Sequence, residues 1–162
     1  MKRTVLVVVS IALMTGGLLA AVTLQWESRK APGIPRNGGV VGAGVNGKFY
    51  IFGGNGPTAG VTTEIYDPAT DTWSYGANMP SRRESPSIAV VDGKMYLIGG
   101  TDPVISGGDY HKGQLTLVEM YDPATNTWTT KASLNYKRDV AGVGVVNGKI
   151  YSIGGMYGEL DL

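Results

Sequence analysis

Cysteine is absent from the 162 residues, and histidine occurs once. Without a thiol, these residues cannot form a disulfide framework, a thiolate metal site or a cysteine nucleophile, and they cannot carry the lipidated cysteine of a lipoprotein. An excess of charge of one sign is also lacking, because 14 Lys and Arg residues stand against 13 Asp and Glu residues. Without a basic bias or an acidic tail, we expect no nucleic acid partner.

A long uncharged stretch follows the first charged residues, Lys2 and Arg3, and covers residues 4–24. It has an apolar middle and the small residues Ala20 and Ala21 near its end, which is the pattern of a secretory signal peptide over residues 1–21. The stretch is also long enough for an uncleaved membrane anchor. Either alternative places the folded part outside the cytoplasm, so we expect a periplasmic or secreted protein that contacts a membrane only through this segment, if at all.

Two repeated motifs account for most of the remaining chain. The sequence NGKFYIFGG over residues 46–54 returns as DGKMYLIGG over 92–100 and as NGKIYSIGG over 147–155. The sequence EIYDPATDTW over 64–73 returns as EMYDPATNTW over 119–128. Spacing inside each motif is fixed, and only the stretch between the two motifs differs in length. Such a pattern predicts several copies of one structural unit.

Each unit predicts four short strands. The first strand is rich in Gly, Ala and Val and ends at Asn-Gly or Asp-Gly, the strongest two-residue hairpin signal. The second is almost continuously apolar, so both of its faces are expected to be buried. An Asp-Pro turn joins the third strand to a fourth that carries Trp and is otherwise mostly polar. This rise in polarity predicts that the first strand lies at a central axis and that the fourth faces water.

These motifs resemble kelch repeats. The double glycine after the second strand, the Tyr before the Asp-Pro turn and the Trp that opens the fourth strand are marks of that family, and they extend from Trp26 to Gly155. The resemblance implies an all-β fold, a kelch-type β-propeller of four-stranded antiparallel blades around a channel.

The number of units predicts an incomplete ring, because propellers have four to eight blades of roughly 50 residues each. We expect an isolated outer strand over residues 22–38 that would latch the last blade. Blade 1 is then expected over 39–86, blade 2 over 87–140 and the truncated first half of blade 3 over 141–162. We therefore expect either a fragment of a longer propeller or a chain that closes its ring by self-assembly.

Strand alternation places the hairpins and Asp-Pro turns on one face, and the loops of variable length over 55–61 and 101–114 on the other. The variable loops are the candidate binding surface, because recognition is commonly carried by variable loops on a rigid scaffold. An Arg at a matched position in each unit either forms a basic collar for an anionic ligand or bonds the backbone of the adjoining blade. The candidate ligand-binding residues are Arg36, Arg83, Arg138, Glu84, Ser85 and Asp139.

Two functions remain open from the sequence. One is an extracytoplasmic recognition module that binds a protein or an anionic glycan through the variable loops, as kelch propellers commonly do. The alternative, implied by resemblance to exported kelch propellers, is a sialic-acid mutarotase, that is, an epimerase. We assign no catalytic residue, metal ligand or cofactor, because His111 has no supporting histidine or cysteine and no Ser-His-Asp set can be assembled.

Overall fold

The computed structural model describes residues 5–6, 28–56, 58–107 and 112–156. The chain divides into two compact units, Met1–Gly33 and Ile34–Leu162. In the first unit, β1 (Val5–Leu6) pairs in antiparallel register with β2 (Ser28–Arg29). Most of the predicted signal peptide and the first part of the predicted outer strand lie outside the described residues. No helix within the described ranges is long and apolar enough to cross a membrane.

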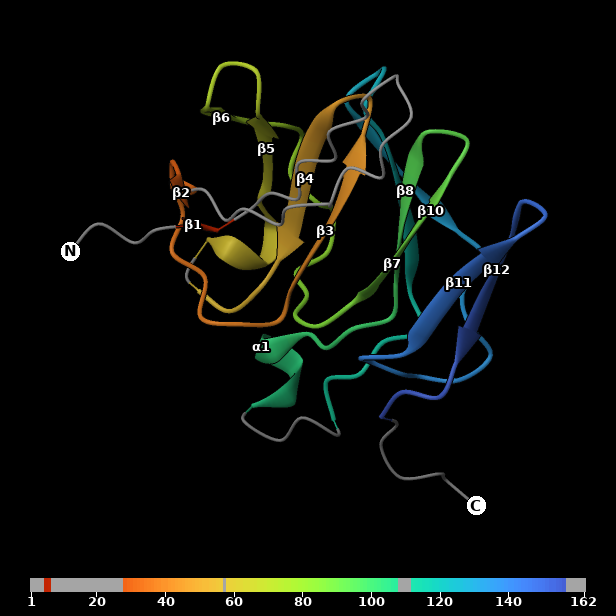
Figure 1. Ribbon diagram of the computed structural model, residues 1–162. Helices are drawn as coiled ribbons and strands as arrows, with labels where there is room; N and C mark the ends of the chain where they lie inside the picture. The colour runs from red at the N-terminus through yellow and green to blue at the C-terminus, as the bar shows by residue number, and fades with distance from the viewer. Residues whose placement is uncertain (1–4, 7–27, 57, 108–111, 157–162) are drawn as a thin grey trace, which may run out of the picture. The chain divides into compact units, whose positions relative to one another are not determined.

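Antiparallel sheets make up the second unit (Figure 1). Two of these sheets have four strands and one has two, and the strands of each sheet follow sequence order. The strands are β3 (Val40–Val45), β4 (Lys48–Gly53), β5 (Thr63–Asp67) and β6 (Thr72–Tyr75); β7 (Ser87–Val91), β8 (Lys94–Ile98), β9 (Val118–Asp122) and β10 (Thr127–Lys131); and β11 (Gly142–Val146) and β12 (Lys149–Ile153). The predicted fold class, all-β with four-stranded antiparallel blades, is confirmed.

The hairpin that joins the first two strands of each blade has the backbone that its sequence predicts. Asn46, Asp92 and Asn147 have φ values of 50°, 48° and 50°, and the glycine that follows each of them also has a positive φ. Positive φ at both central residues is the condition for a two-residue turn that matches the twist of the flanking strands. These turns fix the register of the inner strands, for example Val45 opposite Lys48.

The Tyr before each Asp-Pro turn stabilises that turn through a hydrogen bond of its hydroxyl. The Tyr66 hydroxyl contacts Asp71 Oδ1 at 2.6 Å, and the Tyr121 hydroxyl contacts Asn126 Oδ1 at 2.7 Å. Burial raises the pKa of Tyr121 to about 12, with the neighbouring Tyr50 and Asp122 adding to the effect. The hydroxyl therefore stays protonated at neutral pH and can donate to the turn.

The hydrophobic core lies between the blades. Phe52 of the first blade is fully buried and meets the rings of Tyr121 and Trp128 from the second blade at centroid distances of 5.8 and 5.5 Å. The Trp128 indole also donates to the Ala77 carbonyl at 2.9 Å, which joins the second blade to the linker that precedes it. A second cluster, centred on Ile98, packs the second blade against the third. Each blade therefore needs a neighbour to bury its face.

Candidate functional site

The loops of variable length lie at one end of the blades, and the hairpins and Asp-Pro turns lie at the other (Figure 1). The loop after β4 contains the 3-10 helix η1 (Ala59–Val61), and the loop after β8 contains α1 (Pro103–Ser106). The linkers between blades return to the same end, because each blade has an even number of strands. We call this end, formed by described residues of 54–62, 76–86, 99–117 and 132–141, the loop face.

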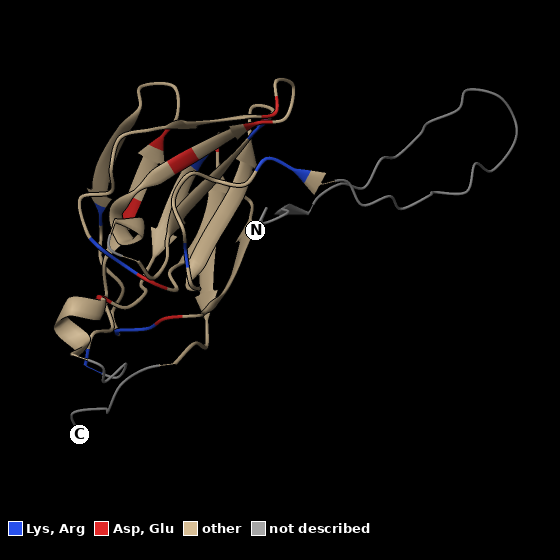
Figure 2. Cartoon of the chain, turned by 90° about the vertical axis from the view of Figure 1, so that its left-hand side faces the viewer, with Lys and Arg blue, Asp and Glu red and all other residues tan. Residues whose placement is uncertain are grey.

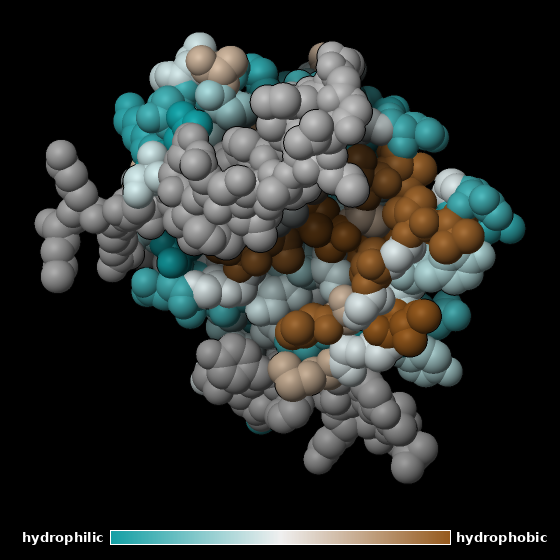
Figure 3. All heavy atoms as spheres, in the orientation of Figure 1, coloured by the Kyte–Doolittle hydropathy of each residue, from teal (hydrophilic) through white to brown (hydrophobic). Residues whose placement is uncertain are grey.

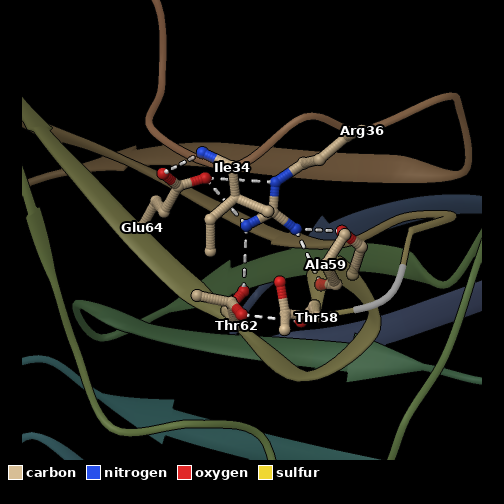
Figure 4. A network of polar contacts seen from close by, with 7 residues as sticks. Ile34, Arg36, Thr58, Ala59, Thr62 and Glu64 are labelled. Atoms are coloured by element: carbon tan, nitrogen blue, oxygen red, sulfur yellow. Dashed lines mark hydrogen bonds and ion pairs between the residues drawn. The ribbon is translucent and has the colours of Figure 1, made fainter.

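Arg36 is the centre of a polar network on the loop face (Figure 4). Its Nη1 donates to the carbonyl oxygens of Gly53 and Ala59, the second at 2.8 Å. Its Nη2 donates to Glu64 Oε2 at 2.9 Å and to the Thr62 carbonyl at 3.3 Å, and its Nε donates to Glu64 Oε2 at 3.2 Å. The Glu64 side chain is fully buried. The guanidinium therefore holds the η1 loop against β5.

Arg83 occupies the matching position between the first two blades. Its Nη1 donates to the Gly99 carbonyl at 3.2 Å, and its Nη2 donates to Glu119 Oε2. Neither side chain is more than 1% exposed. Desolvation lowers the pKa of Arg83, and the carboxylate of Glu119 acts in the opposite direction. Ser81 donates to the other carboxylate oxygen at 3.0 Å, so the buried acid is held from two sides.

Arg138 repeats only part of this arrangement. Its Nη1 donates to the Gly154 carbonyl at 2.8 Å, but it has no carboxylate partner within the described residues. All three arginines thus bond the first carbonyl of the double glycine in the blade that follows them. The sequence left two roles open for these arginines. The structure shows the second of them, in which each arginine bonds backbone of the adjoining blade. Arg83, being fully buried, offers no surface to a ligand.

Two of the other candidate residues, Glu84 and Asp139, lie immediately after the last two arginines. Each exchanges a pair of backbone hydrogen bonds with the next blade, Glu84 with Thr101 at 2.8 Å and Asp139 with Met156 at 3.1 Å. The Asp139 carboxylate also accepts hydrogen bonds from the Thr101 hydroxyl at 2.8 Å and the Gln114 amide at 3.3 Å. The buried Asp139 is therefore fully engaged within the protein.

Glu84 differs from Asp139 because one of its carboxylate oxygens, Oε1, has no hydrogen-bond partner among the described residues. The residue is only 6% exposed. Desolvation raises the pKa of Glu84, and the positive charge of Arg82 acts in the opposite direction. A buried polar atom without a partner is uncommon in folded proteins. Of the two carboxylate candidates, Glu84 is the one with an oxygen that has no hydrogen-bond partner among the described residues.

Ser85 belongs to a chain of backbone contacts that crosses from blade to blade. Its amide donates to the Gly39 carbonyl at 2.7 Å, and its own carbonyl accepts the Val140 amide at 3.2 Å. Gly39, Ser85 and Val140 have φ values of 65°, 49° and 49°. This left-handed conformation lets each linker turn into the first strand of the next blade, so the main chain of Ser85 has a positioning role.

The sequence reasoning missed α1, which projects from the longest loop of the loop face. The Asp102 carboxylate caps the helix by accepting the amides of Val104 at 2.8 Å and Ile105 at 3.4 Å. Pro103 is the first helical residue, and Gly107 ends the helix with a φ of 55°. Asp102-Pro103 followed by Gly107 is a sequence signal for the start and end of a short helix, so α1 could have been predicted from these residues.

Within the described residues, no group of three or more His, Cys, Asp or Glu side chains could hold a metal ion. His111 lies outside the described residues.

Comparisons with known proteins agree with this architecture. The Kelch motif family model matches residues 36–80 and 82–135. Mouse Kelch-like protein 28 is 33% identical over 98 residues, which cover 60% of this chain and 17% of that protein. N-acetylneuraminate epimerase from Pasteurella multocida strain Pm70 is 30% identical over 167 residues, which cover 81% of this chain and 44% of that protein. This chain thus spans less than half the length of either relative.

The solved structure of YjhT superposes with a TM-score of 0.66 and 23% identity, covering 80% of this chain and 48% of that chain. At this identity the likeness concerns the fold, and it agrees with the blades described above. Because the family model covers more than half of the residues, and covers both four-stranded blades, the chain belongs to the kelch-motif family.

Proposed function

We propose that this chain is a recognition module that binds a protein partner through the loop face, outside the cytoplasm. The observation that carries the proposal is the pair of aliphatic side chains on α1, because Val104 is 75% exposed and Ile105 is 61% exposed. The Asp102 cap accepts hydrogen bonds from the backbone amides of both residues, which fixes the backbone that carries them. Exposed apolar side chains on a backbone of fixed conformation are typical anchors of protein interfaces.

The charge distribution of the described residues favours a protein over a polyanion as the ligand. Basic and acidic residues are interspersed at both ends of the blades (Figure 2). The arginines that a basic collar would use are turned toward carbonyl oxygens of the fold, and two of them have carboxylate partners. A mixed surface with a few apolar anchors suits a protein interface, where electrostatics tune specificity and apolar contacts supply affinity. The proposal of an extracytoplasmic location rests on the N-terminal sequence alone.

The test is affinity capture with the mature protein from the extracytoplasmic fraction of its source cells, after light crosslinking. The double variant Val104→Ser and Ile105→Ser is expected to reduce the yield of the specific partner at least about tenfold, because hot-spot side chains carry most of the binding energy. The matched control is Tyr75→Ser, which removes an exposed aromatic side chain from the outer strand β6. Equal capture by the wild type and the α1 variant would contradict the proposal.

A second candidate function is sugar epimerisation, and one specific observation favours it. The relative named as an N-acetylneuraminate epimerase covers 81% of this chain, against 60% for Kelch-like protein 28. Glu84 is the carboxyl best placed to act on such a substrate, because its Oε1 has no partner among the described residues and burial raises its pKa above the ordinary value.

Exchange between the anomers of N-acetylneuraminate, followed by NMR with the protein added, tests this second function. Faster exchange that is lost in Glu84→Gln and kept in Ser85→Ala would support it. An exchange rate equal to that of buffer alone would exclude it for these residues.

A further inference from the structure

Glu84 differs from the other buried acids of the described residues in having a carboxylate oxygen, Oε1, without a hydrogen-bond partner. Glu64 and Glu119 are each bound by an arginine guanidinium. Asp139 accepts hydrogen bonds from a hydroxyl and an amide. Because a buried carboxylate oxygen without a donor costs free energy, a donor from another molecule would be bound favourably at Glu84.

One of the two donors that serve the acid of the second linker is missing from the loop of the first blade. The arginine before each acid donates its backbone amide to the preceding loop, at Gly60 in the first blade and at Leu115 in the second. The residue before Leu115 is Gln114, which supplies its amide to the acid. The residue before Gly60 is Ala59, whose methyl group has no donor. The loop therefore offers Glu84 no equivalent of this hydrogen bond.

The second donor, the hydroxyl of Thr101, is not replaced either. Thr101 follows the double glycine of its blade, and Asn55 stands at that position in the first blade. Asn55 is exposed, and its side chain makes no hydrogen bond with Glu84 Oε1. The two linkers thus hold matched acids, but only the second of these acids receives its donors from the chain itself.

Glu84 lies beside the start of α1 on the loop face. Its backbone exchanges two hydrogen bonds with Thr101, each at 2.8 Å, and α1 begins two residues later at Pro103. Val104 follows Thr101 by three residues, so their Cα atoms are at most about 11 Å apart. Glu84 is 6% exposed, which makes it the most accessible of the buried acids among the described residues. One ligand can therefore contact both α1 and Glu84.

A guanidinium is the group that best replaces the missing donors. It presents two parallel N–H groups to one carboxylate, so it does the work of a hydroxyl and an amide together. This fold already uses a guanidinium for two of its buried acids. Arg82 is near enough to act on Glu84 electrostatically, but its Nη1 donates to the Gly56 carbonyl at 3.2 Å and Glu84 Oε1 has no partner.

We propose that Glu84 binds an arginine side chain of the protein partner, next to the contact that the partner makes with Val104 and Ile105. This inference rests on the proposed function, because it names the group that the partner places beside α1. Hydrophobic and hydrophilic surface lie side by side at the loop-face end of the view in Figure 3. Such a surface suits a partner segment in which an arginine stands next to apolar residues.

Binding of N-acetyl-arginine amide to the full chain tests the site directly. The backbone amide NMR signals are followed at constant ionic strength, and we expect saturation in the millimolar range, with the largest shifts at Glu84, Ser85 and Thr101. N-acetyl-citrulline amide has nearly the same shape but carries a neutral urea in place of the guanidinium. It should bind at least about fivefold more weakly, because charge-assisted hydrogen bonds are the stronger ones.

Two variants of the chain then locate the contact. Glu84→Gln should weaken binding of the arginine probe at least about tenfold, because the probe loses its counter-charge. Asp92→Asn is the matched control and should leave binding unchanged. It also removes one negative charge, but from a hairpin at the opposite end of the blades, where Asn46 and Asn147 have the same positive φ as Asp92.

Three results would overturn the proposal: no saturation up to about 50 mM of the arginine probe, equal affinity of the two probes, or equal loss of binding in the two variants. Partner capture separates this inference from the proposed function. Capture that depends on Val104 and Ile105 but not on Glu84 would leave the proposed function standing and reject the arginine site. Binding of the arginine probe at Glu84 with capture that does not depend on α1 would support the site and reject the proposed function.

Discussion

Arg83 and Glu119 form an ion pair that is closed off from solvent, with the guanidinium also bonded to the Gly99 carbonyl. The two residues come from different parts of the chain, a linker after the first blade and the third strand of the second. The pair therefore ties the linker to the blade that follows it. Removing both charges from water is costly, so we expect the pair to matter chiefly through the penalty for breaking it.

The first prediction follows from that penalty. Glu119→Gln should lower the free energy of unfolding by about 3–5 kcal/mol, because it leaves the guanidinium of Arg83 buried without a counter-charge. The measurement is urea denaturation of the full chain, followed by tryptophan fluorescence. The double variant Arg83→Met and Glu119→Leu is the control, and should be less destabilised than Glu119→Gln. If the double variant were the less stable of the two, the charge penalty would not be the cause.

The second prediction concerns Gly99, the first glycine of the second double-glycine motif. A Cβ there would lie 2.1 Å from the Arg138 carbonyl oxygen, and φ is +63°. Gly93, in the hairpin of the same blade, has a φ of +71° but nothing within 4 Å of its Cβ position. Gly93→Ala should therefore cost about 1–2 kcal/mol for the backbone conformation alone. Gly99→Ala should cost at least about 1–3 kcal/mol more, because backbone has to move.

Urea denaturation of the two glycine variants side by side measures that difference. A similar loss of stability in both would mean that the double glycine is required for its dihedral angles and not for the close approach of the linker.

The strands and turns could be predicted from the sequence because their signals are local. Asn46-Gly47 specifies its own turn, and the apolar run of β4 specifies a strand, in which the residues from Tyr50 to Gly53 are buried. The role of the arginines could not be settled in this way. Burial of Arg83 depends on Glu119, which is 36 residues distant in the chain, and on a sheet register that no single motif contains.

Two other features could not be predicted from the sequence either, because they depend on contacts between segments that are distant in the chain. Asp139 and Glu84 stand at matched positions in the sequence, yet the first has two side-chain partners and the second has an oxygen with none. The difference arises from Thr101 and Gln114, which the longer loop of the second blade supplies. The exposure of Val104 and Ile105 on α1 is likewise a property of how the loop folds, although the Asp-Pro start and the Gly stop of the helix were visible beforehand.

The third prediction concerns the pH dependence of stability and rests on Glu84. Burial raises the pKa of this carboxyl above its ordinary value of 4.5, so the folded state binds the proton more tightly than the unfolded state. The contribution of Glu84 to stability is then most favourable below pH 4.5 and declines as pH rises toward the raised pKa. Glu84→Gln removes the ionisation, so its stability relative to wild type should increase as pH rises above 4.5.

Thermal unfolding of the wild type and Glu84→Gln at a series of pH values, at constant ionic strength, measures this change. Asp139→Asn is the matched comparison, because the Asp139 carboxylate has two hydrogen-bond donors and its replacement should destabilise the fold at pH 7. A difference between Glu84→Gln and wild type that stayed constant or decreased with pH would contradict the assignment of a raised pKa.

The fourth prediction concerns Val140, a β-branched residue with a φ of 49° that is 61% exposed. A β-branched side chain in this region is strained by about 1–3 kcal/mol, and little burial offsets the strain here. Gly39 occupies the same position in the first blade and has a φ of 65°. Val140→Gly should therefore raise the free energy of unfolding by about 1 kcal/mol, despite the greater entropy that glycine gives the unfolded chain.

Val145→Gly is the matched control, because Val145 is also partly exposed but lies in the extended strand β11. There glycine relieves no strain and should lower stability by about 0.5–1 kcal/mol. Urea denaturation of both variants gives the two changes with opposite signs if the backbone of Val140 is strained. Destabilisation by both would show instead that the exposed side chain of Val140 contributes more to the folded state than its conformation costs, and that this linker is held in place by packing.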